Sequence, residues 1–168
     1  MSNIILIGFM GSGKTTIGEK LSLMKNMRFI DLDLEVEKLE KKTINDIFTE
    51  KGEQCFRNIE SKLLEKYCYL DDVVISTGGG IVESNDNIEI LKNKKNVIWL
   101  DGNVDTILNH LRNETHKRPK LKDEKNLEEY IKKLLDYRKD KYNKASNIKI
   151  DINGKNIEQV ISEILVYI

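Results

Sequence analysis

The chain has 168 residues, which suits one compact domain over residues 1–168 with a sizeable core. It is 39% hydrophobic and 33% charged, which excludes a disordered chain, and its 28 basic and 28 acidic side chains cancel, which argues against a nucleic-acid partner. No stretch approaches the length of a membrane span, and the first apolar run is too short for a signal peptide. We therefore expect a soluble, cytoplasmic, monomeric protein without nucleic-acid or membrane partners.

Short β-rich runs alternate with helical patterns along the chain. In chain order, the predicted strands are Ile4–Ile7, Arg28–Asp31, Val73–Ser76, Val97–Leu100 and Asn147–Ile150. Apolar residues at helical spacing form three sets: Ile17, Leu21 and Met24; Phe56, Ile59, Leu63 and Tyr67; and Ile157, Val160, Ile161, Ile164, Leu165 and Ile168. This alternation predicts an α/β fold in which helices cover both faces of a parallel sheet.

Residues 109–126 interrupt the alternation. The segment reads NHLRNETHKRPKLKDEKN, with two aliphatic residues and the only proline, so we expect a polar loop that buries no core face. A long polar loop inside a compact domain is usually functional or disordered. Arg118 could act from a mobile lid and neutralise charge on a transferring phosphoryl group, and a merely solvated loop is the alternative.

A phosphate-binding motif follows the first predicted strand. Residues 8–15 read GFMGSGKT and match G-x-x-x-x-G-K-[ST], in which glycines turn backbone N–H groups toward phosphate oxygens and the next helix adds its positive end. Lys14 can reach the β- and γ-phosphates, and the Thr15 hydroxyl can ligate Mg²⁺. The motif predicts a nucleotide site but does not separate kinases from GTPases, ATPases or synthetases.

Two acidic residues close the second predicted strand. Asp31 and Asp33 are two residues apart, so a strand would place both carboxylates on one side, facing the phosphate loop at the carboxyl edge of the sheet. One could support Mg²⁺ through a water molecule, and the other could hold an acceptor hydroxyl. The alternative is a helix N-cap at Asp33, just before Leu34.

Three further features could belong to an acceptor site, and each has a plainer alternative. Arg57 lies four residues after Glu53 and three before Glu60, so it could simply pair with either one on a solvated helix face. Gly78–Gly80 follows a predicted strand, which indicates either a close approach of the backbone to a ligand or a tight turn. Arg138 could merely complement the end of a helix.

In order and spacing, these segments resemble the shikimate kinase family, whose pattern runs GFMGxGK[ST]T, DxD, GExxFRxxE, GGG, an R-P lid and R-x-x-x-Y-x-x-x-A. The matching segments are Gly8–Thr16, Asp31 with Asp33, Gly52–Glu60, Gly78–Gly80, Arg118 with Pro119, and Arg138 with Tyr142 and Ala145. The resemblance implies a P-loop fold like that of nucleoside monophosphate kinases: a five-stranded parallel sheet flanked by helices, with a mobile lid at about 109–126. It also implies an acceptor-binding segment at about 31–60.

The resemblance further implies transfer of the ATP γ-phosphoryl group to the 3-hydroxyl of shikimate, with Mg²⁺ as cofactor. The implied ATP contacts are Gly11, Ser12, Gly13, Lys14, Thr15, Thr16 and Arg118. The implied shikimate contacts are Asp33, Arg57, Gly79, Gly80 and Arg138. Thr15 would ligate the metal, with Asp31 behind a water, and the implied catalytic residues are Lys14, Asp33 and Arg118.

The chain departs from the family pattern in two places. After Arg118 and its proline the family usually has two aliphatic residues, where this chain has K-L, and near the C-terminus, where the family often offers Arg or Pro to adenine, residues 153–155 read NGK. The adenine contacts therefore stay open. A gluconate kinase, the nearest rival, would share the fold and the loop but lack the F-R-x-x-E segment and the GGG. A non-catalytic nucleotide-binding module would have lost Lys14, Asp33 or the lid arginine.

Overall fold

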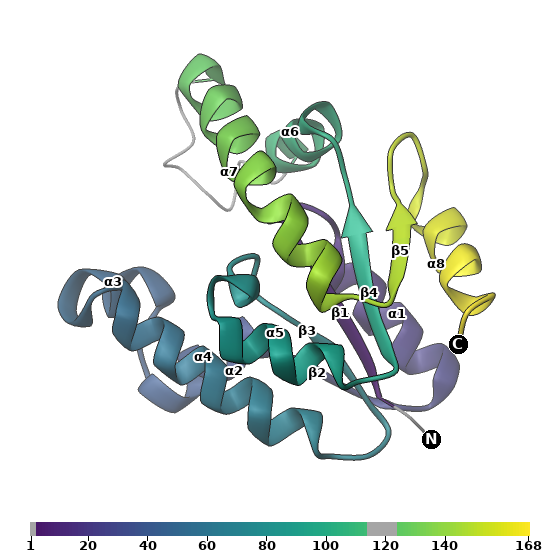
Figure 1. The fold of residues 1–168 in the computed structure, drawn as a ribbon, viewed down its shortest axis with the longest axis horizontal. Helices are drawn as coiled ribbons and strands as arrows, with labels where there is room; N and C mark the ends of the chain where they lie inside the picture. The colour runs from purple at the N-terminus through teal and green to yellow at the C-terminus, as the bar shows by residue number, and fades with distance from the viewer. Residues whose placement is uncertain (1–2, 114–123) are drawn as a thin grey trace.

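The structure is a computed structural model that describes residues 3–113 and 124–168. At its centre is a sheet of five strands: β1 (Ile4–Gly8), β2 (Arg28–Asp31), β3 (Val73–Ser76), β4 (Asn96–Asp101) and β5 (Ile148–Asp151). The strand order is β2-β3-β1-β4-β5, and every neighbouring pair is parallel (Figure 1). The predicted five-stranded parallel sheet is confirmed.

Helices cover both faces of this sheet because its central strand is apolar on both sides. Ile5 and Ile7 of β1 pack on the side of α4 (Glu53–Cys68), α5 (Asn85–Lys92) and α7 (Glu124–Ala145). Ile4 and Leu6 pack on the opposite side, against α1 (Lys14–Lys25) and α8 (Ile157–Leu165). All five residues of β1 are buried, as expected for a strand with two covered faces.

The remaining elements extend from the carboxyl edge of the sheet. Two helices, α2 (Leu32–Glu40) and α3 (Ile44–Lys51), form a lobe with α4 beside β2, at the left of Figure 1. A short 3₁₀ turn, η1 (Ile81–Glu83), follows β3, and α6 (Val104–Asn113) follows β4. No helix within residues 3–113 and 124–168 has the length and apolar character needed to cross a membrane.

A third, smaller apolar cluster joins the loop after β1 to α6 and α7. It comprises Phe9, Ile107, Leu108, Leu111 and Ile131. Leu111 is almost fully buried, so the prediction that residues 109–126 bury no core face is wrong for their first part, which continues α6 to Asn113. One leucine on the inner face of a helix is enough to anchor an otherwise polar stretch. Residues 114–123 of that segment, including Arg118, lie outside the described residues.

The predicted helix faces are mostly confirmed. Val160, Ile161 and Ile164 are buried on α8, and Phe56, Leu63 and Tyr67 are buried on α4. Ile168 lies beyond the end of α8, and Met24 is the one exposed member of these sets, since 60% of it is exposed. Met24 lies in the last turn of α1. Its helical spacing from Ile17 and Leu21 could not predict that this turn no longer packs on the sheet.

Candidate active site

The carboxyl ends of β1, β2 and β3 meet at one edge of the sheet. Because β3 lies between the other two and all are parallel, the segments that follow these strands are neighbours. Together they enclose a cavity of about 140 Å³. Its lining residues are Met10, Gly11, Gly13, Lys14, Thr15, Thr16, Asp31, Asp33, Ser76, Thr77 and Gly79. The structure therefore brings the predicted phosphate loop, both predicted acids and the glycine stretch together.

The phosphate loop takes the glycine-dependent course that its motif predicts. Gly11 and Gly13 have φ angles of 76° and 89°, in the left-handed region that other residues avoid. Lys14 folds back along the loop, where its Nζ donates to the Gly8 oxygen at 2.8 Å and the Phe9 oxygen at 2.9 Å. Lys14 is 7% exposed, so the side chain is buried in the loop. These contacts fix the ammonium group inside the loop.

The prediction that Asp31 and Asp33 lie on one strand is wrong. The strand ends at Asp31, whose Oδ1 accepts from the backbone N–H of Asp33 at 3.0 Å and of Leu34 at 3.3 Å. Asp31 is therefore the N-cap of α2, and Asp33 lies in the first turn of that helix. The alternative of a helix N-cap is therefore right, but the capping residue is Asp31 and not Asp33. Both carboxylates still line the cavity around the loop.

The donor set beside the loop fits a hard cation. The Thr15 hydroxyl donates to Asp31 Oδ2 at 2.8 Å, so two oxygen ligands from α1 and β2 lie together. Mg²⁺ usually takes one or two protein oxygens and completes its shell with water and substrate phosphates. No cluster of three or more His, Cys, Asp or Glu able to hold a metal occurs within residues 3–113 and 124–168. Thr15 and Asp31 offer two side-chain oxygens, which is the number that Mg²⁺ usually takes from a protein.

Arg57 lies between two carboxylates at the edge of a larger cavity. Its Nη1 is 2.9 Å from Glu60 Oε2, and its Nη2 is 3.3 Å from Glu53 Oε1. The alternative that Arg57 pairs with these glutamates is borne out, but the Glu60 side chain is fully buried and that of Arg57 is 17% exposed, so only the pair with Glu53, which is 62% exposed, lies at the surface. Burial raises the pKa of Glu60 to about 6, against the opposing effect of Arg57, and the nearby Asp33 adds to the rise.

The glycines after β3 leave room for these charged side chains. A Cβ at Gly80 would overlap the guanidinium of Arg57, and one at Gly78 would lie 2.8 Å from Asp33 Oδ1 and also collide with Glu60. A Cβ at Gly79 would come within 3.1 Å of the Met10 nitrogen. A plain turn would not need three such positions. The groups that approach this stretch closely are side chains and the loop backbone of this chain, and its approach to a ligand stays a prediction.

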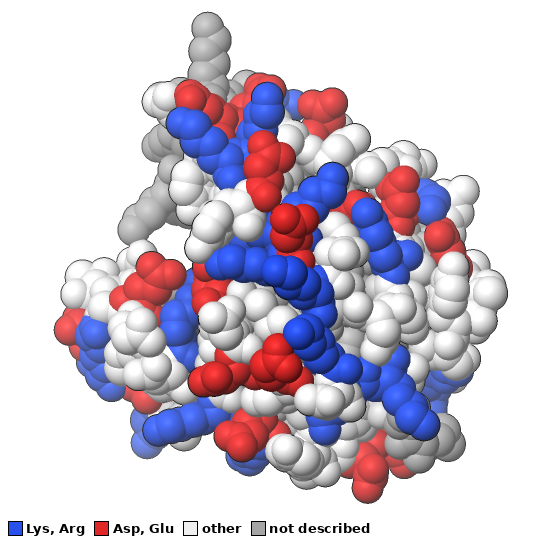
Figure 2. Space-filling view, in the orientation of Figure 1, with Lys and Arg blue, Asp and Glu red and all other residues white. Residues whose placement is uncertain are grey.

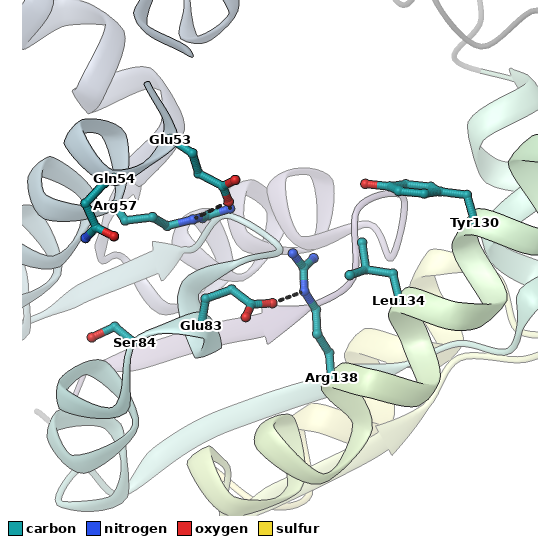
Figure 3. A pocket seen from close by; sticks show the side chains of 8 residues that line it. All are labelled: Glu53, Gln54, Arg57, Glu83, Ser84, Tyr130, Leu134 and Arg138. Atoms are coloured by element: carbon teal, nitrogen blue, oxygen red, sulfur yellow. Dashed lines mark hydrogen bonds and ion pairs between the residues drawn. The ribbon is translucent and has the colours of Figure 1, made fainter. Parts of the chain in front are cut away.

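Arg138 of α7 reaches the same cavity from the other side. Its Nε is 2.6 Å from Glu83 Oε1, and the residue is 7% exposed, so it does not simply complement a helix end. Figure 3 shows Arg57 and Arg138 on opposite sides of a cavity of about 730 Å³, with Tyr130 on the α7 wall. In Figure 2 the surface is indented between the lobe of α3 and α4 and the upper half of α7.

An adjoining cavity of about 860 Å³ connects these arginines to the phosphate loop. Its lining includes Met10, Asp33, Arg57, Glu60, Gly78, Gly79, Gly80, Tyr130, Leu134 and Arg138. All the predicted acceptor residues therefore lie around one space. Arg118 is the single predicted site residue that falls outside the described part of the chain.

Sequence reasoning missed several groups in this region. Glu83, Lys141 and Tyr130 carry no motif signal, because a charged or aromatic residue on a turn or helix is usually a solvated surface group. Tyr142 belongs to the matched pattern, and its hydroxyl donates to the Gly79 oxygen at 2.5 Å. This bond ties α7 to the glycine stretch, which is a structural reason for a tyrosine four residues after Arg138.

A further cavity of about 410 Å³ lies on the other side of the loop. It is lined by Gly11, Ser12, Gly13, Thr16, Ile17, His110, Asn113, Ile152, Lys155, Asn156, Ile157, Glu158 and Val160. His110 Nδ1 lies 2.6 Å from the Gly11 oxygen, so α6 contacts the loop directly. Residues 153–155 occupy the stretch where the family often contacts adenine, and one of them, Lys155, lines this cavity.

Comparisons with known proteins agree with this geometry. The family model described as shikimate kinase matches residues 10–168. A shikimate kinase from Persephonella marina is 43% identical over 165 residues, which cover 98% of each chain. A shikimate kinase from Acinetobacter baumannii, solved in complex with shikimate, superposes with a TM-score of 0.89 at 33% identity, over 98% of this chain and 91% of that one.

A gluconokinase from Sinorhizobium meliloti superposes less closely, with a TM-score of 0.58 and 14% identity over 98% of this chain and 90% of that one. At that identity the likeness shows a shared fold alone. This likeness therefore gives the gluconate kinase alternative no support beyond the shared fold. The chain belongs to the shikimate kinase family.

Proposed function

We propose that this chain transfers the γ-phosphoryl group of ATP to the 3-hydroxyl of shikimate, giving 3-phosphoshikimate and ADP in the synthesis of aromatic amino acids. The observation that carries the proposal is a single cavity. It holds Asp33, Arg57, Arg138 and the Gly78–Gly80 stretch, and it adjoins the phosphate loop. An acceptor with one carboxylate and several hydroxyls matches two arginines opposite one aspartate.

The phosphate loop supplies the charge that the reaction needs. In phosphoryl transfer the protein mainly positions the reactants and stabilises negative charge, so we assign Lys14 to the β- and γ-phosphates. Thr15 and Asp31 would hold Mg²⁺, which when bound adds positive charge at the phosphates. We also assign Arg118 to the phosphates, on its sequence motif alone.

Asp33 is the residue that we assign to the acceptor hydroxyl. It lines both the loop cavity and the acceptor cavity, so its carboxylate lies between the two reactants. It can orient the hydroxyl and accept its proton. Because the transition state of phosphoryl transfer is loose, orientation contributes more than basicity.

Arg57 and Arg138 are the groups that we assign to the substrate carboxylate. A planar guanidinium can make two parallel hydrogen bonds to a carboxylate, whereas a lysine offers only a point charge. Their positions on opposite walls suit recognition of an anion that lies between them. Shikimate meets this requirement, and so would other hydroxylated monocarboxylates.

The test is a coupled assay of ADP release with shikimate and gluconate side by side. We expect turnover with shikimate, loss of turnover when EDTA removes Mg²⁺, and little ADP without an acceptor. Faster turnover with gluconate would overturn the substrate assignment. Equal ADP release with and without shikimate would identify an ATPase.

A further inference from the structure

Glu83 holds two cations of α7 at the wall of the acceptor cavity. Its Oε1 accepts from Arg138 Nε at 2.6 Å, and its Oε2 accepts from Lys141 Nζ at 3.1 Å. Arg138 and Lys141 are three residues apart on one helix, so they present their side chains to the same carboxylate. The three side chains are 9% to 25% exposed, so water screens these contacts only in part.

The contact through Nε sets the direction of the Arg138 guanidinium. A guanidinium has one Nε and two terminal nitrogens, and Glu83 takes the Nε. Figure 3 shows the two terminal nitrogens pointing away from Glu83 and into the cavity that Arg57 also lines. The guanidinium carbon lies 5.9 Å from the centre of the Phe9 ring, which restricts it further. Glu83 thus does not itself occupy the two terminal nitrogens, which are the donors that a carboxylate ligand would use.

The charges on the two walls of the cavity are balanced differently. Arg57 lies between Glu53 and Glu60, so two carboxylates surround one cation. On the opposite wall Arg138 and Lys141 share one carboxylate, which leaves an excess of one positive charge. The excess positive charge of the α7 wall would therefore attract an anionic ligand.

Hydrogen bonds to Glu83 and Tyr137 favour the protonated form of Lys141. Burial favours its neutral form, but hydrogen bonds to the Tyr137 hydroxyl and Glu83 raise its pKa above the usual value. Burial likewise favours protonated Glu83, but Arg138 and Lys141 outweigh this effect and lower its pKa. Both shifts favour the charged forms of Glu83 and Lys141.

We propose that Glu83 and Lys141 are positioning residues for recognition of the substrate carboxylate, Glu83 by aiming Arg138 and Lys141 by offsetting the charge of Glu83. Neither needs to touch the substrate. Without Lys141, Glu83 would cancel the charge of Arg138 and weaken its attraction for an anion. The inference rests on the proposed function, because it assigns Arg138 to that carboxylate.

The test compares four forms of the protein by calorimetric binding of shikimate and its carboxamide analogue, with turnover measured separately. We expect Lys141→Met to weaken shikimate binding about fivefold, as loss of one nearby charge in a partly screened site would. Glu83→Gln keeps an oxygen for Arg138 Nε and raises the excess on this wall to two positive charges, so it should bind shikimate up to about fivefold more tightly than the wild type. The double variant restores the excess of one positive charge, so it should bind shikimate within about twofold of wild type, and thus better than Lys141→Met alone. Binding of the uncharged carboxamide should change little throughout.

A purely structural role gives the opposite pattern. The double variant would then be the weakest binder, and shikimate and the carboxamide would be affected alike; either result overturns the inference. Thermal unfolding of each variant shows whether it is folded, and Lys132→Met on the same helix is the matched control. If the wild type turns over shikimate while the variants fail the expected pattern, the inference alone is wrong. If the wild type neither binds nor phosphorylates shikimate, the proposed function fails, and the inference fails with it.

Discussion

The phosphate side and the acceptor side of this site are built in different ways. On the phosphate side, the short loop after β1 and the first turn of α1 supply the glycines, the lysine and the threonine within residues 8–16. On the acceptor side, Asp33, Arg57, Glu83 and Arg138 come from α2, α4, η1 and α7. The loop depends on local backbone conformation, whereas the acceptor wall depends on ion pairs between distant segments. Substitutions on the two sides should therefore impair the protein in different ways.

The largest effect is expected from Lys14→Met, on the phosphate side. Removing one preorganised charge from a phosphoryl-transfer site typically costs about 10²- to 10³-fold in rate, so kcat should fall by at least that much. The variant also loses hydrogen bonds to the Gly8 and Phe9 oxygens. Steady-state kinetics and thermal unfolding measure both effects. Lys25→Met, at the far end of the same helix, is the control, and near-normal turnover of Lys14→Met would refute the loop assignment.

Arg57→Lys should give the next largest effect, and only on the acceptor side. A hydrogen bond to a charged group contributes roughly 1.5–3 kcal/mol, so kcat/KM for shikimate should fall about 10- to 100-fold. The KM for ATP should stay unchanged. Equal losses with shikimate and its carboxamide would show that Arg57 does not read the carboxylate. Arg28→Lys, at the amino end of β2, is a matched substitution far from the site.

A pH-dependent effect is expected from Glu60→Gln. The pKa of Glu60 is raised from 4.5 to about 6 in the folded state, so the native protein holds this proton more tightly than the unfolded chain. Its stabilising contribution is complete below pH 4.5 and is lost as the pH rises through about 6. The free energy of unfolding of wild type minus that of the variant should fall by about 2 kcal/mol over this range.

Urea unfolding at several pH values measures this difference. Glu65→Gln, on the exposed part of the same helix, controls for the loss of a carboxylate. A difference that does not vary with pH would show that Glu60 is not perturbed by burial.

The smallest effect is expected from Gly80→Ala. The added Cβ would meet the end of the Arg57 side chain, which can move, and the backbone of Gly80 has a φ of −91°, which alanine adopts readily. The fold should therefore survive, while Arg57 is displaced and the KM for shikimate rises by about tenfold or less. An equal rise in the KM for ATP would mean that the two sides are not separate.

The same contrast explains what the sequence could predict. The order of strands and helices and the phosphate loop follow from local periodicity and one motif, and the structure agrees with both. Asp31 and Asp33 were expected on one strand, but Asp31 caps α2 with its own side chain, and alternation along a strand cannot reveal such a cap. Arg57 and Arg138 could be placed only through a family pattern, since each alone is compatible with a surface ion pair.

Glu83 and Lys141 could not be predicted because their contact joins segments 58 residues apart. Nothing in their local sequence distinguishes them from solvated residues. Leu111 was missed for a related reason: its buried neighbours Phe9 and Ile131 lie in other segments. Long-range packing, rather than helix or strand propensity, determines these positions.

The glycine stretch after β3 has a consequence for redesign of the acceptor specificity. Every substitution at Gly78–Gly80 adds atoms, so this wall can only move inward and can never be widened to admit a bulkier acceptor. Extra volume has to come from other lining residues, such as Phe48 of α3 and Tyr130 and Leu134 of α7, which can be shortened. A library directed at those three positions, with the glycines kept, is therefore the route by which this scaffold could evolve toward larger hydroxy acids.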